Sequence, residues 1–281
     1  MNKKYQFAII TNDYQEPKKF ALLLKEKLQQ RKVKENSLRP DIVFVIGGDG
    51  TFLKAVNKYN QQLDKIKFVT FNQGNVGFYH NFLVDQFDQV IDSLANNDKN
   101  LIINQLDLLE VSINEKVIYG INEFRLVNLS QTLSCDVYIN DQFLEFFRGS
   151  GIIIATKTGA TGLMKTAGGA IIFAAEKLMQ YQELFPVNNS GYRTINSPIV
   201  FDQNQIITLK IKNIHQTQVS TDKKTNEKTI NTQIVVDTFN FYDKLVKEIK
   251  IKLSTQTLKV FSYKNSLETL TMKLNKYFIK S

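Results

Sequence analysis

An acidic residue stands among three glycines in the segment Gly47-Gly48-Asp49-Gly50. An apolar run, residues 41–46, ends directly before this segment, and helix-like spacing resumes directly after it. A glycine turn between a strand and a helix lets backbone N–H groups approach a phosphate, and the helix N-terminus adds partial positive charge. A tight Asp-Gly turn in which Asp49 caps the helix is an equally open alternative. The role of the carboxylate is the open question, because a negative charge repels phosphate.

A second glycine-rich segment, residues 72–78, follows the apolar run 65–71 and contains Asn72, Gly74 and Phe78. If both apolar runs are parallel strands, the two glycine loops lie at the same edge of one sheet. Open α/β sheets bind their ligands at that edge. Two such loops favour a phosphate-rich ligand, although Asn-x-Gly is also a common turn sequence.

The polar pair Asn122-Glu123 interrupts an apolar strand candidate at residues 119–127. Neighbouring strand residues face opposite sides, so one of the pair is expected to face a covered side. Burying an unpaired amide or carboxylate costs roughly 2–7 kcal/mol, which a ligand with hydroxyls and ring nitrogens would offset. An edge strand with both side chains in water explains the pair equally well.

Small and hydroxyl-bearing residues are densest between Thr156 and Gly169, shortly after Arg148. Such a loop can lie close against a planar base or a sugar, and an arginine can bind phosphate through two hydrogen bonds. A flexible linker is the weaker alternative, because apolar segments flank the loop on both sides. The candidate ligand-binding residues of this loop are Thr158, Thr161, Gly162 and Thr166.

The elements that position these segments can be predicted from the hydrophobic pattern. In the N-terminal third, apolar runs predict strands at 5–11, 41–46 and 65–71, and amphipathic spacing predicts helices at 17–31, 50–59 and 84–96. This alternation of strand and helix is typical of an open parallel sheet.

Beyond residue 100 the pattern changes to short strands joined by polar turns, at 108–113, 116–127, 135–140, 151–156, 205–212 and 232–239, with a helix at 168–182. A strand at 257–263 and a helix at 266–278 return to α/β character. The predicted fold is therefore an α/β N-terminal domain with an open parallel sheet, plus a mostly-β C-terminal domain, with a C-terminal tail returning to the first domain. The predicted domains are 1–100 plus 256–281, and 101–255.

Composition narrows the function classes. The 281 residues carry a formal net charge of +9, but the lysines are scattered, so we expect no nucleic-acid partner. No apolar run reaches the roughly 18–20 residues that span a bilayer, so we expect no membrane partner and a cytoplasmic location. One cysteine, Cys135, excludes an internal disulfide framework, and we expect it to be a small buried residue. The two histidines, His80 and His215, lack metal-ligand spacing and are expected on the surface or in loops.

Taken together, in this order and at this spacing, these segments resemble the NAD kinases, also called ATP-NAD kinases, over essentially the full length. The chain is most similar in type to the short bacterial enzymes of Gram-positive organisms. The Gly-Gly-Asp-Gly-Thr segment alone is shared with diacylglycerol and sphingosine kinases. The combination of that segment with four others is much more specific to the NAD kinases. The four are the loop 72–78, Asn122-Glu123, the segment 147–151 and "GYRTINSPIVF" at 191–201.

The resemblance implies transfer of the γ-phosphoryl group of ATP to the adenosine 2′-hydroxyl of NAD, giving NADP and ADP, with a divalent metal ion, Mg²⁺ being the expected one. It implies an active site between the two domains, the second of which binds the dinucleotide, in a homo-oligomer, a dimer or a tetramer. Asp49 matches the family's proton acceptor, with Gly50 beside it. The family's dinucleotide-binding residues are matched by Asn122, Glu123, Arg148, Thr161 and Thr166.

Several positions depart from the family pattern. Ser150 stands where the family usually has Asp, and Gly162-Leu163 where it usually has Ala-Tyr. Lys157 replaces a common proline, and Phe185 replaces a small residue. By resemblance, the positions of Ser150, Leu163 and Phe185 serve the nicotinamide end of the substrate. The residues for phosphoryl transfer therefore match the family pattern, whereas those for nicotinamide recognition depart from it.

Asp237 falls where the family has a Val-Asp-Gly segment, and its role at the site stays open without the glycine. Two alternative functions remain: a non-catalytic dinucleotide-binding or regulatory relative, and a lipid kinase that shares the Gly-Gly-Asp-Gly-Thr segment. The matches beyond residue 120 speak against a lipid kinase, which needs a pocket for acyl chains.

Overall fold

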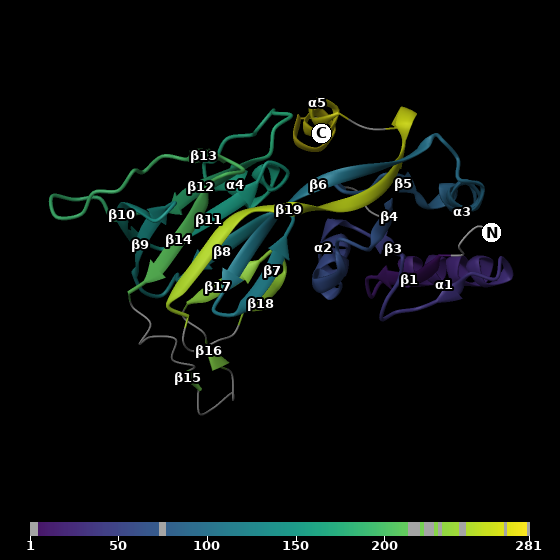
Figure 1. Cartoon of the computed structure of the whole chain (residues 1–281), viewed down its shortest axis with the longest axis horizontal. Helices are drawn as coiled ribbons and strands as arrows, with labels where there is room; N and C mark the ends of the chain where they lie inside the picture. Colours follow the sequence, from purple (N-terminus) through teal and green to yellow (C-terminus); the bar gives the residue numbers. More distant parts are fainter. Residues whose placement is uncertain are drawn as a thin grey trace. The chain divides into compact units, whose positions relative to one another are not determined.

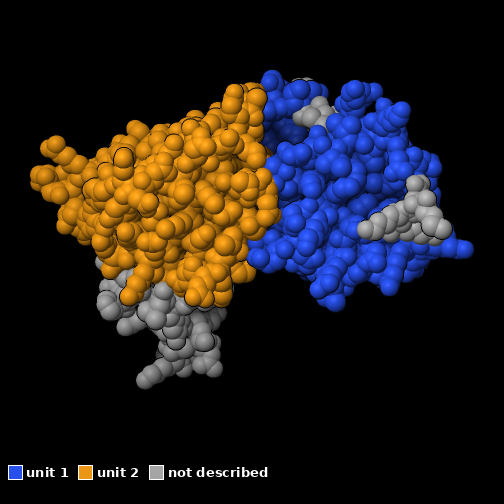
Figure 2. All heavy atoms as spheres, in the orientation of Figure 1, with its two compact units in different colours: residues 1–106, 257–281 blue, residues 107–256 orange. Residues whose placement is uncertain are grey.

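The computed structural model describes residues 5–72, 77–212, 220–221, 228–229, 232–241, 246–266 and 269–279. The chain forms two compact units, coloured separately in Figure 2: Met1–Leu106 with Thr257–Ser281, and Asp107–Gln256. The sequence-based boundaries at 100/101 and 255/256 fall slightly earlier in the chain. Gly74 and His215 lie outside the described residues, so the expectations for them cannot be compared with the structure.

The first unit contains the predicted parallel sheet, with strand order β19-β4-β3-β1-β2 and every neighbouring pair parallel (Figure 1). Its strands are β1 (Gln6–Thr11), β2 (Lys34–Glu35), β3 (Ile42–Gly47), β4 (Lys67–Asn72), the short β5 (Phe82–Leu83) beside β4, and the later part of β19 (Glu248–Tyr263). Its helices are α1 (Gln15–Gln30), α2 (Asp49–Lys58), α3 (Phe87–Asn96) and α5 (Leu270–Leu274), with 3₁₀ turns η1 (Asn60–Gln62), η2 (Val84–Gln86) and η5 (Lys264–Ser266) and a π-helical turn η6 (Asn275–Ile279).

The core of this unit explains the continuous apolar runs. All residues of β3 are buried, as expected for a parallel strand covered on both faces. Phe44 of β3 and Phe71 of β4 lie in one apolar cluster with Leu24 and Leu28 of α1 and Ile91 of α3. The register pairs Gly47 with Asn72, so the two glycine-rich segments leave the sheet side by side, as the sequence predicted.

The second unit is built from antiparallel strands. One sheet has the order β13-β12-β11-β8-β17-β18, and another runs β10-β9-β14 to the early part of β19, with β6 and β7 paired as a hairpin. Their bounds are β6 (Leu101–Ile113), β7 (Lys116–Gly120), β8 (Glu123–Val127), β9 (Leu133–Ile139), β10 (Gln142–Gly149), β11 (Gly151–Thr156), β12 (Leu178–Leu184), β13 (Ile199–Asp202), β14 (Ile206–Ile211), β17 (Gln233–Val236) and β18 (Phe239–Phe241). The short pair β15 (Ser220–Thr221) and β16 (Lys228–Thr229), the 3₁₀ turn η3 (Gly159–Thr161) and the helix α4 (Leu163–Thr166) complete the unit.

A single apolar cluster joins the two sheets of the second unit. It includes Phe124 and Ile152 from one sheet and Val137, Phe147 and Leu209 from the other. Cys135 lies in the same cluster and is fully buried, as predicted. Burial raises the pKa of its thiol far above the ordinary value, which agrees with a packing role rather than a nucleophilic one.

The predicted helix at 168–182 is wrong. Residues 168–177 are irregular, and the rest becomes β12, which pairs with β11 and β13 and buries Met179 and Tyr181. The Lys157 ammonium binds the carbonyls of residues 174–176, which a helix would have used for its own hydrogen bonds. Pairing with two neighbouring strands therefore outweighs local helix propensity.

Two smaller differences from the predicted elements follow. The helix predicted at 266–278 is a short α-helix, α5, that continues as the π-helical turn η6. Strands β10, β12 and β13 had no counterpart in the prediction. Within the described part of the chain, no helix has both the length and the apolar character needed to cross a bilayer.

Candidate active site

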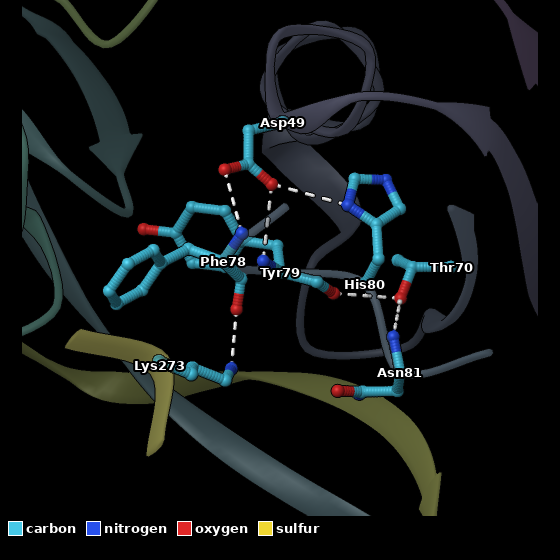
Figure 3. Close-up of polar contacts among 7 residues, drawn as sticks. All are labelled: Asp49, Thr70, Phe78, Tyr79, His80, Asn81 and Lys273. Carbon is cyan, nitrogen blue, oxygen red and sulfur yellow. Dashed lines mark hydrogen bonds and ion pairs between the residues drawn. The ribbon is translucent and has the colours of Figure 1, made fainter. Parts of the chain in front are cut away.

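The first candidate site is the Asp49 cluster, which we define as Asp49 with the loop residues Phe78, Tyr79 and His80 (Figure 3). The Phe78 backbone N–H donates to Asp49 Oδ2 at 2.8 Å, and the Tyr79 N–H donates to Oδ1 at 3.1 Å. His80 Nδ1 lies 3.2 Å from the same Oδ1. The Asp49 side chain is 30% exposed, so its carboxylate is fixed on one side and open on the other.

The alternative in which Asp49 caps helix α2 is wrong. Gly48 is the N-cap residue of α2 and, as a glycine, supplies no capping side chain. Asp49 is the first residue of the helix, and its carboxylate binds the loop after β4 instead. A negative charge in the first turn still interacts favourably with the helix dipole.

The loop that binds Asp49 is itself held from behind. Thr70 Oγ1 donates to the Tyr79 carbonyl at 2.8 Å and accepts the Asn81 N–H at 3.2 Å. The Asn81 side chain donates to the Phe261 carbonyl. Lys273 donates to the Phe78 carbonyl (Figure 3). With their carbonyls bound on the far side, the loop N–H groups are directed at Asp49.

The glycines beside Asp49 have different reasons to be glycine. Gly47 has a φ of +153°, and a Cβ there would lie 2.4 Å from Thr51 Oγ1, so the backbone and the packing both require it. A Cβ at Gly48 or Gly50 would meet none of the described atoms within 4 Å. Packing against the described residues therefore does not require glycine at either position.

A cavity of about 230 Å³ lies beside this cluster in the first unit. Asn72, His80 and Gln86 line it together with Lys273 and Tyr277. Asn72 Oδ1 is buried and has no hydrogen-bond partner among the described residues. Phe78, another predicted site residue, packs its ring against Tyr277 and Phe278 at centroid distances of 5.6 and 5.9 Å.

His80 was expected on the surface or in a loop, and it lies in a loop but not on the surface. Its side chain is 1% exposed and faces Asp49. Sequence reasoning missed it because the search was for metal-ligand spacing, and the partner of His80 is a single carboxylate on another element. Its position soon after the loop 72–78 was the available signal.

The second candidate site is the Asn122–Glu123 cluster, which we define as Asn122, Glu123, Arg125 and Asp237. The Asp237 carboxylate accepts the backbone N–H groups of Ile121 at 2.7 Å, Asn122 at 2.8 Å and Glu123 at 3.0 Å. Its own N–H donates to the Glu123 carbonyl, and Arg125 donates to the Asp237 carbonyl. Asp237 therefore fixes the backbone that presents the polar pair, a role that the sequence had left open.

The two carboxyl groups of this cluster titrate near neutral pH. Burial and, to a smaller extent, the nearby Asp237 charge together raise the pKa of Glu123 to about 7, and the Arg125 charge opposes them. Burial likewise raises the pKa of Asp237 to about 6, against the three N–H groups that stabilise its anion. The sequence left open whether the side chains of Asn122 and Glu123 are buried or lie in water at an edge strand. Glu123 is buried, with 7% of its surface exposed.

The Thr-Gly loop packs directly on the backbone of this pair. Thr156 Oγ1 donates to the Ile121 carbonyl at 2.6 Å and accepts the Gly159 N–H at 3.0 Å. A Cβ on Gly159 would lie 2.0 Å from the Asn122 carbonyl oxygen, so only glycine allows this approach. A Cβ on Gly162 would lie 3.9 Å from Glu123 Oε2.

The structure brings some of the predicted binding residues together and leaves others apart. Thr161, whose hydroxyl donates to the Thr158 carbonyl, lies in the loop that contacts Asn122, whereas Leu163 and Thr166 are solvent-exposed. Arg148, Ser150 and Phe185 form a separate group. The Arg148 guanidinium lies over the Tyr192 ring at 4.3 Å, and a Cβ on Gly149 would lie 2.8 Å from the Phe185 carbonyl.

Within that group, the Ser150 N–H donates to the Leu184 carbonyl at 2.9 Å. The Phe185 side chain is 79% exposed, and its backbone has a φ of +46°. A left-handed backbone is uncommon for an aromatic residue, which agrees with a tight turn at the end of β12.

Comparisons with known proteins identify the family. Residues 7–99 match the ATP-NAD kinase N-terminal domain, and residues 121–248 match the ATP-NAD kinase C-terminal domain. The NAD kinase of Lactobacillus johnsonii is 31% identical over 264 residues, covering 92% of each chain. The NAD kinase of Mycoplasmoides gallisepticum is 35% identical over 213 residues, covering 75% of this chain and 74% of its own.

Solved structures show the same fold. Yeast NADH kinase complexed with NADH aligns with a TM-score of 0.78 at 17% identity, covering 100% of this chain and 89% of its own. An NAD kinase from Archaeoglobus fulgidus in complex with ATP aligns with a TM-score of 0.71 at 16% identity, covering 96% and 99%. The chain matches both ATP-NAD kinase domains and is more than 30% identical to NAD kinases along most of its length. It therefore belongs to the ATP-NAD kinase family.

Proposed function

We propose that this protein transfers the γ-phosphoryl group of ATP to the adenosine 2′-hydroxyl of NAD, giving NADP and ADP. Family membership supports the reaction class. The observation in this chain that carries the proposal is the fixed, partly exposed carboxylate of Asp49, whose chain neighbours Gly48 and Gly50 carry no side chain. An acceptor hydroxyl can approach such a carboxylate closely.

Asp49 acts as the proton acceptor in this proposal. The hydroxyl proton passes to an Asp49 oxygen, the hydroxyl oxygen forms a bond to the γ-phosphorus, and the bond to the leaving ADP breaks. The N–H groups of Phe78 and Tyr79 hold the carboxylate in one orientation before substrate arrives. A positioned base contributes about 10²–10⁴-fold, and positioning with charge neutralisation supplies most of the remaining acceleration.

The Asn122–Glu123 cluster binds the dinucleotide in this proposal. Asn122 and Glu123 offer hydrogen bonds to ribose hydroxyls and base nitrogens, and Gly162 lets a flat ring approach the backbone near Glu123. Arg148 offers a guanidinium for a phosphate. The group of Ser150 and Phe185 lies near Arg148 and is the proposed place where nicotinamide recognition differs from that of relatives.

A divalent ion fits the Asp49 cluster as part of the metal–ATP complex. Mg²⁺ keeps several waters and is held by substrate phosphates with one or two carboxylates. The ATP phosphates are the ligands that we propose for the ion, and Asp49 remains the proton acceptor. When bound, the ion neutralises charge on the phosphates. By resemblance we further propose NADP biosynthesis in the cytoplasm by a homo-oligomer, a dimer or a tetramer.

The test is an assay of the purified protein with ATP, Mg²⁺ and NAD, coupled to an NADP-specific dehydrogenase. Inorganic polyphosphate as donor and NADH and diacylglycerol as acceptors form parallel arms. We expect NADP formation, and a loss of about 10²-fold or more in kcat for Asp49→Asn with NAD binding retained. Dinucleotide binding without turnover would favour a regulatory relative, and phosphorylation of diacylglycerol would favour a lipid kinase.

A further inference from the structure

His80 is an unusual residue to find behind Asp49. Its ring is buried, and neither ring nitrogen has an aligned hydrogen bond among the described residues. Nδ1 is nevertheless only 3.2 Å from Asp49 Oδ1 (Figure 3). Leaving a polar group buried without a full partner costs about 1–3 kcal/mol, so packing alone does not favour a histidine here.

The loop does not need the imidazole for its own conformation. Thr70, Asn81 and Lys273 already bind its backbone through hydrogen bonds that do not involve the ring. The chain also keeps room for the ring, because a Cβ on Gly77 would lie 2.7 Å from His80 Nδ1. The feature that the ring does serve is the Asp49 carboxylate.

The contacts of the ring distinguish its two nitrogens. Nδ1 faces the Asp49 carboxylate on α2, and a carboxylate oxygen can only accept a hydrogen bond. Around the neighbouring cavity lie Asn72 on β4, Gln86 in η2, and Lys273, Lys276 and Tyr277 of the C-terminal segment. Hydrogen on Nδ1 is therefore the arrangement that matches the contact with Asp49.

We propose that His80 is a positioning residue for Asp49, donating its Nδ1–H to Oδ1 and holding the carboxylate with its free lone pairs toward the substrate hydroxyl. This inference rests on the proposed function of Asp49. The three consecutive residues 78–80 then supply three donors to one carboxylate, two from the backbone and one from the ring. Bond angles tighten in the substrate complex, as catalytic hydrogen bonds often do.

The kinetic test compares His80→Leu, His80→Asn and the core variant Val90→Ala, a substitution in α3 that serves as a stability control. A hydrogen bond to a charged group is worth about 1.5–3 kcal/mol, so we expect His80→Leu to lower kcat by about 10- to 100-fold with little change in KM for NAD. His80→Asn, whose amide can replace Nδ1–H, recovers most of kcat, and Val90→Ala lowers only the melting temperature.

Two kinetic outcomes overturn the inference: unchanged kcat in His80→Leu, or a loss of kcat in His80→Asn as large as that in His80→Leu. A second measurement does not depend on turnover. Nitrogen-15 NMR of the imidazoles, assigned with His80→Asn because the chain has two histidines, reports the tautomer in the ligand-free protein. We expect hydrogen on Nδ1 and a shift of its resonance in Asp49→Asn. If the hydrogen is on Nε2, the inference about His80 is refuted, even if the enzyme is active. If the hydrogen is on Nδ1 but the protein makes no NADP, the proposed function is refuted instead.

Discussion

Asp237→Asn is the substitution that most directly tests how the dinucleotide-binding pair is held. Oδ1 of Asp237 accepts the N–H groups of Asn122 and Glu123, and Oδ2 accepts that of Ile121. An asparagine that keeps its carbonyl at the Oδ1 position retains two of these bonds. Its amide group then faces the Ile121 N–H, so two donors oppose each other in a buried place.

The expected cost is about 1–3 kcal/mol for the stranded donor. Removal of a buried charge offsets part of this cost, because burial raises the pKa of Asp237 to about 6. The left-handed backbone at Asp237, with a φ of +52°, suits asparagine as well as aspartate, so strain does not add to the cost. Asp237→Ala strands all three N–H groups and should cost at least about 3 kcal/mol.

Urea unfolding at pH 8 gives the stability change, and calorimetric titration with NAD gives the affinity. We expect Asp237→Asn to lower both the unfolding midpoint and NAD affinity, the latter by about 10-fold or more, since one lost hydrogen bond of about 1.4 kcal/mol corresponds to that factor. Asp141→Asn is the matched control, with the same substitution at an exposed left-handed residue with a φ of +64°. Equal stability and equal affinity in Asp237→Asn would refute this account of the cluster.

Two further predictions follow from the same geometry. Gly50→Ala places a methyl group on helix α2 where no described atom lies within 4 Å. We expect thermal melts to show a fold stabilised by about 0.5–1 kcal/mol, and kinetics to show a lower kcat/KM. Unchanged activity would show that the substrate does not use this space. Glu123→Gln should change the pH dependence of stability. Because folding raises the pKa of Glu123 from 4.5 to about 7, the folded protein binds more protons than the unfolded chain between these pH values. The stability of the parent protein therefore falls as the pH rises through that window. The variant lacks this fall, so its urea stability relative to the parent should rise from pH 5 to pH 8 by up to about 3 kcal/mol, and parallel curves would contradict the assignment.

The hydrophobic pattern was enough to predict the parallel sheet and the Asp49 segment. Continuous apolar runs identified β3 and β4, and their glycine-rich ends meet because Gly47 pairs with Asn72. Such features depend on residues close in sequence, whose pattern records burial directly.

Other features depend on partners that no local pattern reveals. Asp237 meets the backbone of residues 121–123 from more than a hundred positions away along the chain. The resemblance singled out Asp237, but no local pattern indicated which backbone it binds. Strand β12 exists because β11 and β13 flank it, although its residues alone suggested a helix. The burial of His80 likewise follows from the meeting of a loop and a helix end that only the folded chain brings together.

The first unit is discontinuous in sequence, and this has a consequence for synthesis on the ribosome. Strand β19 pairs with β4 through Lys259 and Val260, and Lys273 binds the Phe78 carbonyl, yet both lie beyond the whole second unit in chain order. At about 5–20 residues per second, many seconds pass between the emergence of β4 and that of its neighbour. Throughout that interval the nascent sheet keeps an uncovered flank, so this protein should depend on chaperones more before translation ends than after it.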